Sequence, residues 1–273
     1  MEGSFLKGNW IIKKKEKLPE NPYLLLGLPG IGNVAKISAD YIIDELKLKP
    51  FLVIYGKYMP HSVIINKDGT INLPAFYFYK FKNKKNEDIV IITGEAQPIT
   101  EEATYEFAEL VLSLFNYKIK ELVAFAGKGL WHVPEEPSIS IVANNKKYLD
   151  SLFKKVQKIN KNIKKDSSEH LSTITGLAGI LPAFAGIFNI KASTWMADTY
   201  GDPLFLGFNG SYVLIKTLKD YWNFEIDLKE LEEEYNKIVE MVRKGENIIK
   251  KMWKESEKEE RKKEESIKKY YYS

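Results

Sequence analysis

The chain has 273 residues, of which 44% are hydrophobic, and this suits one large domain with a sizeable core or one domain plus an extension. It has no cysteine, which excludes disulfides, thiol catalysis and cysteine–metal sites and fits a reducing compartment. No apolar run approaches the roughly 20 residues that cross a bilayer, and Met1 to Trp10 lacks a signal-peptide pattern, so we expect a cytoplasmic protein with no membrane partner.

In the first half of the chain, short apolar runs alternate with segments of helical periodicity. Thr100 is suited to cap a helix, and the acids that follow it favour the positive end of the helix dipole. In chain order we predict a strand at Tyr23–Gly27, a helix at Val34–Leu46, a strand at Phe51–Tyr55, a hairpin of Ser62–Asn66 with Thr70–Leu73, a strand at Asp88–Thr93 and a helix from Glu101 to about Phe115.

The second half continues the alternation of strands and helices. Gly176–Phe188 is almost wholly apolar, so it should be a buried helix with Pro182 near its start or at a kink. The full prediction is a strand at Glu121–Ala126, a strand at Ser138–Ala143, a helix at Lys146–Val156, a surface connection at Asn160–Lys165, the helix at Gly176–Phe188, a strand at Lys191–Met196 and a helix at Ser211–Asp220.

This alternation predicts an α/β body at residues 1–227, with a mostly parallel or mixed sheet covered by helices on both sides. Residues 228–273 should form a separate C-terminal helical extension. Apolar residues at steps of three and four predict one apolar seam along this helix, made of Leu228, Leu231, Tyr235, Ile238 and Val242. The seam should pack on the chain's own body or on a neighbouring copy.

The basic excess of the chain lies in its C-terminal tail. The net charge is +4, and from Arg243 onward there are 11 basic and 7 acidic residues, so the body is neutral. A neutral body argues against a nucleic-acid surface. Several Glu-to-basic pairs four residues apart, such as Glu257 with Arg261, favour a solvated helix in the tail, and RNA binding by this segment is the alternative.

Four glycine-bearing loops should lie at the C-terminal ends of parallel strands, where α/β folds place ligand sites. They are Gly27–Asn33, Thr93–Pro98, Gly127–Gly129 and Met196–Pro203. The first is neither a dinucleotide fingerprint nor a P-loop, because its glycines fall as G-x-x-G-x-G and no Gly-Lys-Ser/Thr follows. The loops either shape tight turns or form a ligand crevice, whose candidate residues are Gly30, Gly32, Asn33, Glu95 and Asp198.

No catalytic residue can be assigned from these loops. Glu95, Asp198 and Asp202 could supply acid–base carboxylates, but such residues also cap turns and helices. His132 follows Trp131, where aromatic packing and chemistry are equally good interpretations. The three histidines have no metal-ligand spacing, so no metal or other cofactor is expected. An enzyme or small-ligand binder, hydrolase-like or nucleoside phosphorylase-like, is the alternative to the function described below.

The sequence ends in Tyr271, Tyr272 and Ser273. A free carboxylate can be captured by a basic, amide-lined pocket on another protein, while the rings add apolar area and a hydroxyl. These residues are therefore candidate partner-binding residues, and a frayed end is the alternative.

The loops together resemble the proteasome assembly chaperone family. The resemblance covers about Asn21 to Asp227 and rests on Leu25–Lys36, the Asp68-Gly69 hairpin, Thr93–Pro98, Thr175-Gly176-Leu177 and Tyr200–Pro203. At Ala126–Trp131 the chain is less glycine-rich than that family, which puts a shared ligand role for this loop in doubt.

The resemblance implies a nucleoside phosphorylase-like α/β body that forms homo-oligomers and binds proteasome α-subunits or the 20S α-ring without ATP and without catalysis. A paralogue could take part in the assembly. Archaeal members carry a hydrophobic–Tyr–X terminus, so the resemblance assigns docking to Tyr271, Tyr272 and Ser273.

Overall fold

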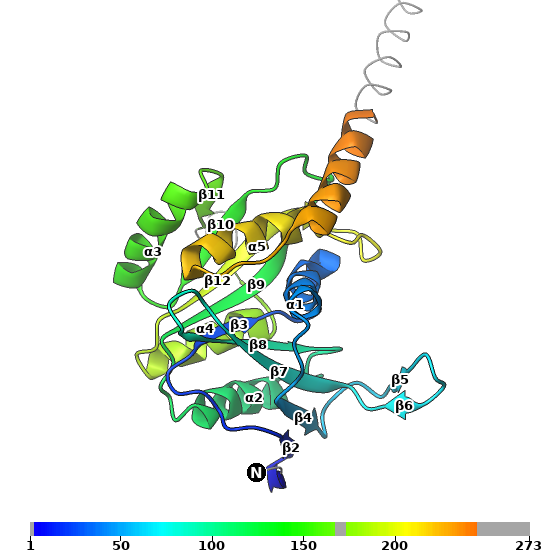
Figure 1. Cartoon of the computed structure of the whole chain (residues 1–273), viewed down its shortest axis with the longest axis vertical. Helices are drawn as coiled ribbons and strands as arrows, with labels where there is room; N and C mark the ends of the chain where they lie inside the picture. Colours follow the sequence, from blue (N-terminus) through cyan, green and yellow to red (C-terminus); the bar gives the residue numbers. More distant parts are fainter. Residues whose placement is uncertain (1–2, 167–172, 245–273) are drawn as a thin grey trace, which may run out of the picture.

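The computed structural model describes residues 3–166 and 173–244 (Figure 1). The strands are β1 (Gly3–Lys7), β2 (Trp10–Lys14), β3 (Tyr23–Leu26), β4 (Leu52–Gly56), β5 (Ile64–Ile65), β6 (Ile71–Asn72), β7 (Ala75–Lys82), β8 (Asp88–Gly94), β9 (Glu121–Leu130), β10 (Ile139–Ala143), β11 (Ile163–Lys165) and β12 (Ala192–Tyr200). The helices are the short 3-10 helix η1 (Ile31–Asn33), α1 (Val34–Glu45), α2 (Glu101–Leu114), α3 (Lys146–Ile159), α4 (Leu177–Ile187), α5 (Phe208–Trp222) and a C-terminal helix whose described part is residues 229–244.

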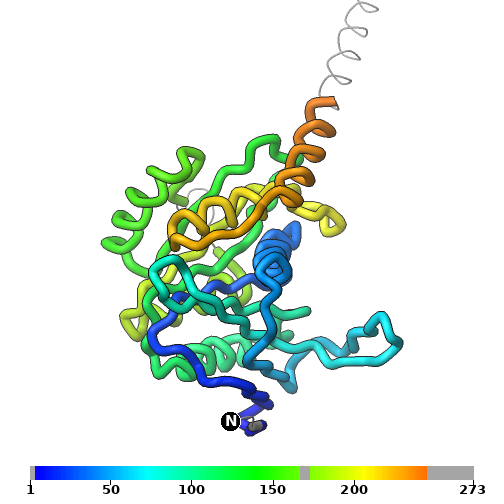
Figure 2. Tube along the Cα trace, in the orientation of Figure 1, coloured from blue at the N-terminus to red at the C-terminus, as the bar shows by residue number. Residues whose placement is uncertain are grey.

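Ten of these strands form one mixed sheet in the order β1-β2-β4-β7-β8-β3-β9-β12-β10-β11. The adjacent strands β8, β3, β9 and β12 are parallel to one another. The first five strands in this order, β1, β2, β4, β7 and β8, pair antiparallel with their neighbours. Strand β10 also runs antiparallel to β12. The remaining two strands, β5 and β6, form a hairpin that extends from the body (Figure 2).

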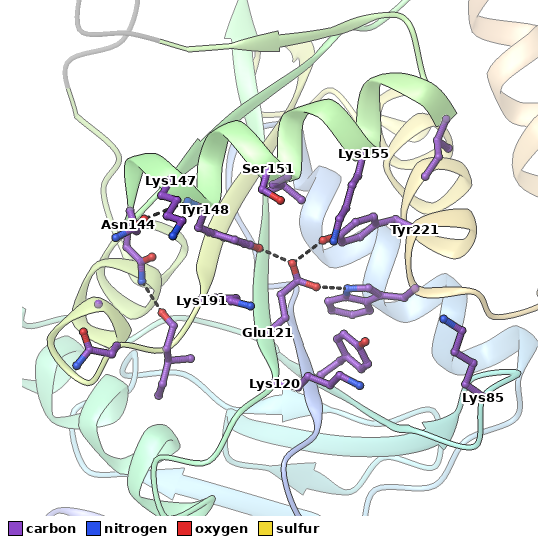
Figure 3. A pocket seen from close by; sticks show the side chains of 18 residues that line it. Lys85, Lys120, Glu121, Asn144, Lys147, Tyr148, Ser151, Lys155, Lys191 and Tyr221 are labelled. Atoms are coloured by element: carbon purple, nitrogen blue, oxygen red, sulfur yellow. Dashed lines mark hydrogen bonds between the residues drawn. The ribbon is translucent and has the colours of Figure 1, made fainter.

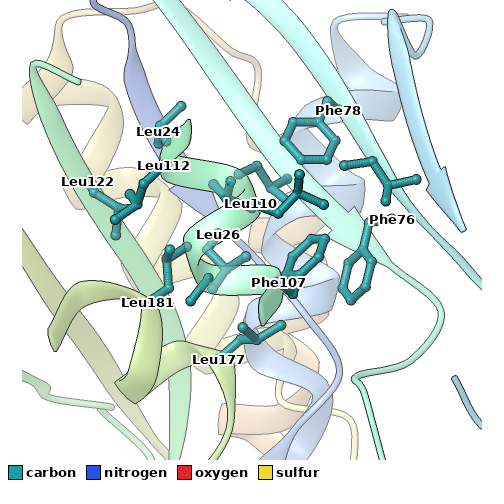
Figure 4. Packing of buried hydrophobic residues seen from close by; sticks show 14 of the residues in the cluster. Leu24, Leu26, Phe76, Phe78, Phe107, Leu110, Leu112, Leu122, Leu177 and Leu181 are labelled. Carbon is teal, nitrogen blue, oxygen red and sulfur yellow. The ribbon is translucent and has the colours of Figure 1, made fainter. Parts of the chain in front are cut away.

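Helices cover both faces of the sheet, as the alternating sequence predicts. Leu24 and Leu26 point to one face, where α2 and α4 pack, and Leu25 points to the other face, where α1, α3 and α5 pack. Figure 4 shows the first of these cores, in which Phe76 and Phe107 stack with ring centroids 3.8 Å apart. Successive residues of a strand point to opposite faces, so a strand buried on both sides must be apolar throughout.

The α/β architecture with a mixed sheet is confirmed, and the structure adds strands that periodicity did not predict. Strands β1, β2 and β7 were not predicted, and the expected surface connection at Asn160–Lys165 contains the edge strand β11. Only Ile163 of that strand is buried, so its sequence is polar like that of a loop. In the described residues, no helix is long and apolar enough to span a membrane.

Helix α4 is less buried than its sequence predicts. Leu177, Leu181 and Ala185 face the core, but the side chain of Ile187 is 69% exposed. Pro182 lies inside the helix rather than near its start. It has no N–H for the carbonyl of Ala178, and the Thr194 hydroxyl donates to that oxygen instead, at 2.6 Å. The carbonyl that Pro182 leaves without its helical partner thus accepts a hydrogen bond from β12.

The C-terminal helix packs on the chain's own body. Leu231 is only 2% exposed, and Tyr235 lies 5.0 Å from Tyr212 of α5, measured between ring centroids. The hydroxyl of Tyr212 also donates to Glu232 at 2.6 Å. Beyond Val239 the side chains are mainly exposed, and the end of the described helix points away from the body (Figure 1).

We expect Leu231→Asp combined with Ile238→Asp to destabilise the body strongly. Both side chains are buried, and charged replacements lose apolar contacts and bury a carboxylate, at a cost of about 3 kcal/mol or more. Urea unfolding followed by circular dichroism measures the change. The matched control is Met241→Asp on the exposed face of the same helix, which should leave the transition unchanged; equal stability of all three proteins would contradict this packing.

Candidate functional site

The four glycine-bearing segments converge at one edge of the sheet, but several of the predicted loops are wholly or partly strand. Gly127–Gly129 lies inside β9, residues 196–200 belong to β12, and residues 93–94 end β8. The four segments follow or end β3, β8, β9 and β12, and because these neighbours are parallel, their carboxyl ends meet. A cavity of about 370 Å³ opens between the loops. Its lining includes Gly30, Gln97, Gly127, Lys128 and Ala178.

Gln97 links the walls of this crevice. Its Nε2 donates to the carbonyl of Pro29 at 2.8 Å, and its Oε1 accepts from the backbone N–H of Leu177 at 3.0 Å. Gly176 approaches the same amide so closely that a Cβ there would lie 2.6 Å from Gln97 Oε1. Both ends of the amide are therefore used to hold the β3 loop against the start of α4. Sequence reasoning marked the Thr93–Pro98 loop but not this residue, for which side-chain geometry was needed.

Gly32 is a packing residue, in contrast to Gly30. Gly32 has φ +59°, and a Cβ there would lie 2.5 Å from Thr199 Oγ1. Its carbonyl also accepts from the N–H of Gly207 at 2.8 Å, which joins the loops after β3 and β12. Gly30 has extended backbone and open space around it, and it lines the crevice. Asn33, with φ +50°, begins α1 without a side-chain cap.

Asp202 lies outside the crevice lining and accepts a hydrogen bond from the backbone N–H of Leu204 at 2.8 Å. The other two candidate carboxylates, Glu95 and Asp198, also lie outside the lining. Glu95 accepts a hydrogen bond from the backbone N–H of Ala75 at 3.0 Å, at the start of β7. Burial raises the pKa of the neighbouring Tyr77, and the charge of Glu95 raises it further. Asp198 accepts from the hydroxyl of Ser138 at 2.5 Å and from its N–H at 3.3 Å. Glu95 and Asp198 therefore each stabilise a strand end, and the structure does not bring the two into one pocket.

Lys128 is the ionisable side chain among the residues that line the described crevice. Its ammonium group pairs with Asp166 at 2.6 Å and donates to Ser140 at 3.3 Å, so its charge is directed towards β10 and β11. Among the described residues, no cluster of three or more histidine, aspartate or glutamate side chains could hold a metal ion. The crevice therefore provides a mainly apolar surface and one side-chain amide, that of Gln97, whose hydrogen bonds are already made within the protein.

Exposed apolar side chains project from the loops around this edge. The side chain of Trp131, just after β9, is 99% exposed, and that of Leu204, after β12, is 91% exposed. Ile31 and Leu206 on neighbouring loops are also exposed. Packing of Trp131 within its own chain, one interpretation of its sequence, is wrong. Large apolar groups on one edge are typical of a protein-binding surface.

The candidate docking residues Tyr271, Tyr272 and Ser273 lie outside the described residues.

Comparisons with known proteins place these features in a family context. A family model described as the PAC2 family matches residues 24–245. A protein of Methanocaldococcus jannaschii is 27% identical over 217 residues, covering 78% of each chain.

Three solved structures share the fold. PbaB of Pyrococcus furiosus, described as an archaeal proteasome activator, gives a TM-score of 0.78 at 24% identity, covering 88% of this chain and 100% of that one. PbaA of the same organism, described as an archaeal homologue of proteasome-assembly chaperone, gives 0.65 at 20% identity, covering 89% and 95%. A proteasome-assembly chaperone homologue of Mycobacterium tuberculosis gives 0.64 at 15% identity, covering 81% and 94%.

The contrast between Gly32 and Gly30 gives a matched stability test. Gly32→Ala should lower the free energy of unfolding by about 2 kcal/mol or more, because it combines positive φ with a clash against Thr199. Gly30→Ala meets nothing within 4 Å and should change stability by less than about 0.5 kcal/mol. Denaturant unfolding checks both variants, and similar losses would show that the loop is not held as described.

Proposed function

Because the chain belongs to the PAC2 family, we propose that it is an ATP-independent proteasome assembly chaperone or 20S α-ring-binding factor that docks through its C-terminal tail. The family match over residues 24–245 carries the proposal. The shared fold with PbaB and PbaA is consistent with it. The partner is a proteasome α-subunit or the assembled α-ring, with no chemical step.

The direction of the C-terminal helix supports docking by the tail. The helix is anchored through Leu231 and Ile238, and its last described residues leave the body (Figure 1). An ion pair between Arg243 and Glu135 of the β9–β10 connection braces the helix near this point. The last described residues of the helix are thereby directed away from the sheet.

We assign one role to each of the last residues. Tyr271 supplies an apolar contact, and Tyr272 supplies packing and a hydroxyl hydrogen bond. The Ser273 carboxylate binds a lysine or backbone amides in the receiving pocket. One tail buries little surface and binds weakly. Several tails on one oligomer raise the effective concentration, and the gain in avidity is about a hundredfold.

Self-association is part of this proposal, and the exposed apolar edge is the surface we assign to it. Trp131 and Leu204 are almost fully exposed in the single chain. A second copy would bury them.

A small-ligand or enzyme function at the crevice is the second candidate, and the 370 Å³ cavity favours it. Against it, Glu95 and Asp198 make hydrogen bonds to the backbone at other positions, and both ends of the Gln97 amide are occupied. The crevice better explains how the loops are fixed than how a substrate would react.

Deleting Tyr271–Ser273, or changing Tyr272→Ala, should abolish co-sedimentation with a cognate 20S particle while leaving oligomer size unchanged. Adding one residue after Ser273 should harm binding almost as much, because it moves the carboxylate. Ser273→Ala is the matched control and should bind normally. Glu95→Ala and Asp198→Ala should also bind; full binding by the deletion variant would place any docking site in the body.

Light scattering tests the proposed self-association. The unmodified chain should be larger than a monomer, and Trp131→Asp with Leu204→Asp should reduce its mass, because two charges would enter the interface. Ile65→Asp, at an exposed apolar position on the β5–β6 hairpin, is the control and should keep the oligomer. A monomeric unmodified chain, or dissociation by the hairpin variant alone, would refute the assigned surface.

A further inference from the structure

A second and larger cavity lies at the opposite edge of the sheet from the crevice. It is about 870 Å³ in volume and opens beside the amino ends of β3, β9 and β12 (Figure 3). Tyr23 and Glu121 are the first residues of β3 and β9, and Lys120 and Lys191 stand just before β9 and β12. Helix α3 forms the other wall. Among the described residues, none that lines the crevice also lines this cavity.

The floor of this groove is built around the carboxylate of Glu121. Glu121 is 6% exposed and accepts hydrogen bonds from the hydroxyls of Tyr148 at 2.5 Å and Tyr221 at 2.7 Å, and from Trp222 Nε1 at 2.9 Å. Burial, followed by the charge of Glu121, raises the pKa of both tyrosines, so they remain protonated donors. Both oxygens of the Glu121 carboxylate accept hydrogen bonds within the protein, and these bonds link β9 to α3 and α5.

Two rows of lysines border the floor. Lys147 and Lys155 stand two turns apart on α3, and Lys191, Lys120 and Lys85 form the facing row (Figure 3). All five are exposed at their side chains. Lys120 pairs with Glu87, whereas within residues 3–166 and 173–244 the other four have no recorded ion pair. The positive charge of the two rows thus exceeds the single negative charge of the Glu121 carboxylate in the floor.

The groove has the length of a short extended segment. The lining follows α3 from Lys147 to Ile159, which are 12 steps apart along the chain and therefore about 18 Å apart at 1.5 Å per residue. An extended chain rises about 3.3 Å per residue, so five or six residues fill this length. Its side chains alternate between two sides, which matches the two lysine rows. A compact anion would reach only part of either row.

From this charge and shape we propose that the groove binds an extended acidic peptide segment of about six residues. Carboxylates on alternate sides of the segment pair with Lys147 and Lys155 on one side and with Lys191 and Lys85 on the other. Its backbone lies over Tyr148 and Tyr221. This site is independent of the proposed docking tail, and the partner is recognised by acidic charge in an extended conformation.

Fluorescence anisotropy with a labelled hexaglutamate peptide tests the site on the full chain. The peptide should bind at low ionic strength and weaken with added salt, whereas hexaglutamine should not bind. Lys147→Glu with Lys155→Glu should weaken binding by about tenfold or more. Lys154→Glu with Lys158→Glu is the matched control, because it makes the same charge change on the same helix outside the groove lining. This control should lose less than about threefold in affinity.

Three results would overturn the proposal. They are no hexaglutamate binding at low salt, equal losses in the two double variants, and binding of tripolyphosphate or single-stranded RNA in the groove without binding of the peptide. Thermal melting of each variant establishes that it is folded. If Lys147→Glu with Lys155→Glu is unfolded, Lys147→Gln with Lys155→Gln takes its place. Its control is then Lys154→Gln with Lys158→Gln, and we expect the groove variant again to lose more affinity than the control.

Discussion

Burial of both faces of the parallel strands β8, β3, β9 and β12 is the constraint on which the other features of this protein depend. Water cannot reach the middle of these strands, so their side chains there are almost wholly apolar and their backbone groups pair within the sheet. Polar and charged groups can gather only where the strands begin or end. The crevice occupies one such edge, and the lysine-lined groove occupies the other.

Buried polar groups are hydrogen-bonded in different ways at the two edges of the sheet. At the carboxyl edge, Gln97 satisfies backbone groups of two loops, while Glu95 and Asp198 do the same for strand ends. At the amino edge, the buried Glu121 carboxylate accepts hydrogen bonds from three donors on α3 and α5. A buried charge of this kind is tolerated only when its hydrogen bonds are complete. Lysine side chains lie around the amino edge, and exposed apolar side chains lie around the carboxyl edge.

The body and the C-terminal helix divide the work in the proposed function. The body provides a stable platform and an apolar edge that suits self-association. The helix is fixed to α5 through Tyr212 and Leu231 and then leaves the body, so its direction is determined by ordinary core packing. In the proposed function, the avidity of a weakly binding tail increases with the number of tails on one oligomer, and the body determines that number.

The sequence by itself determined the elements whose burial leaves a periodic pattern, including β3, α1, β8, α2 and the apolar seam of the C-terminal helix. It also placed the glycine loops at the ends of parallel strands. It did not show β1, β2, β7 or β11. Strand β11 lies at one edge of the sheet and buries only Ile163, so its sequence resembles that of a loop. Only the tertiary structure decided that Glu95 and Asp198 lie apart from the crevice, that Gln97 joins its walls, and that Glu121 meets Tyr221 from 100 residues away. Such side-chain contacts depend on how distant elements pack against one another, and the local sequence pattern does not predict them.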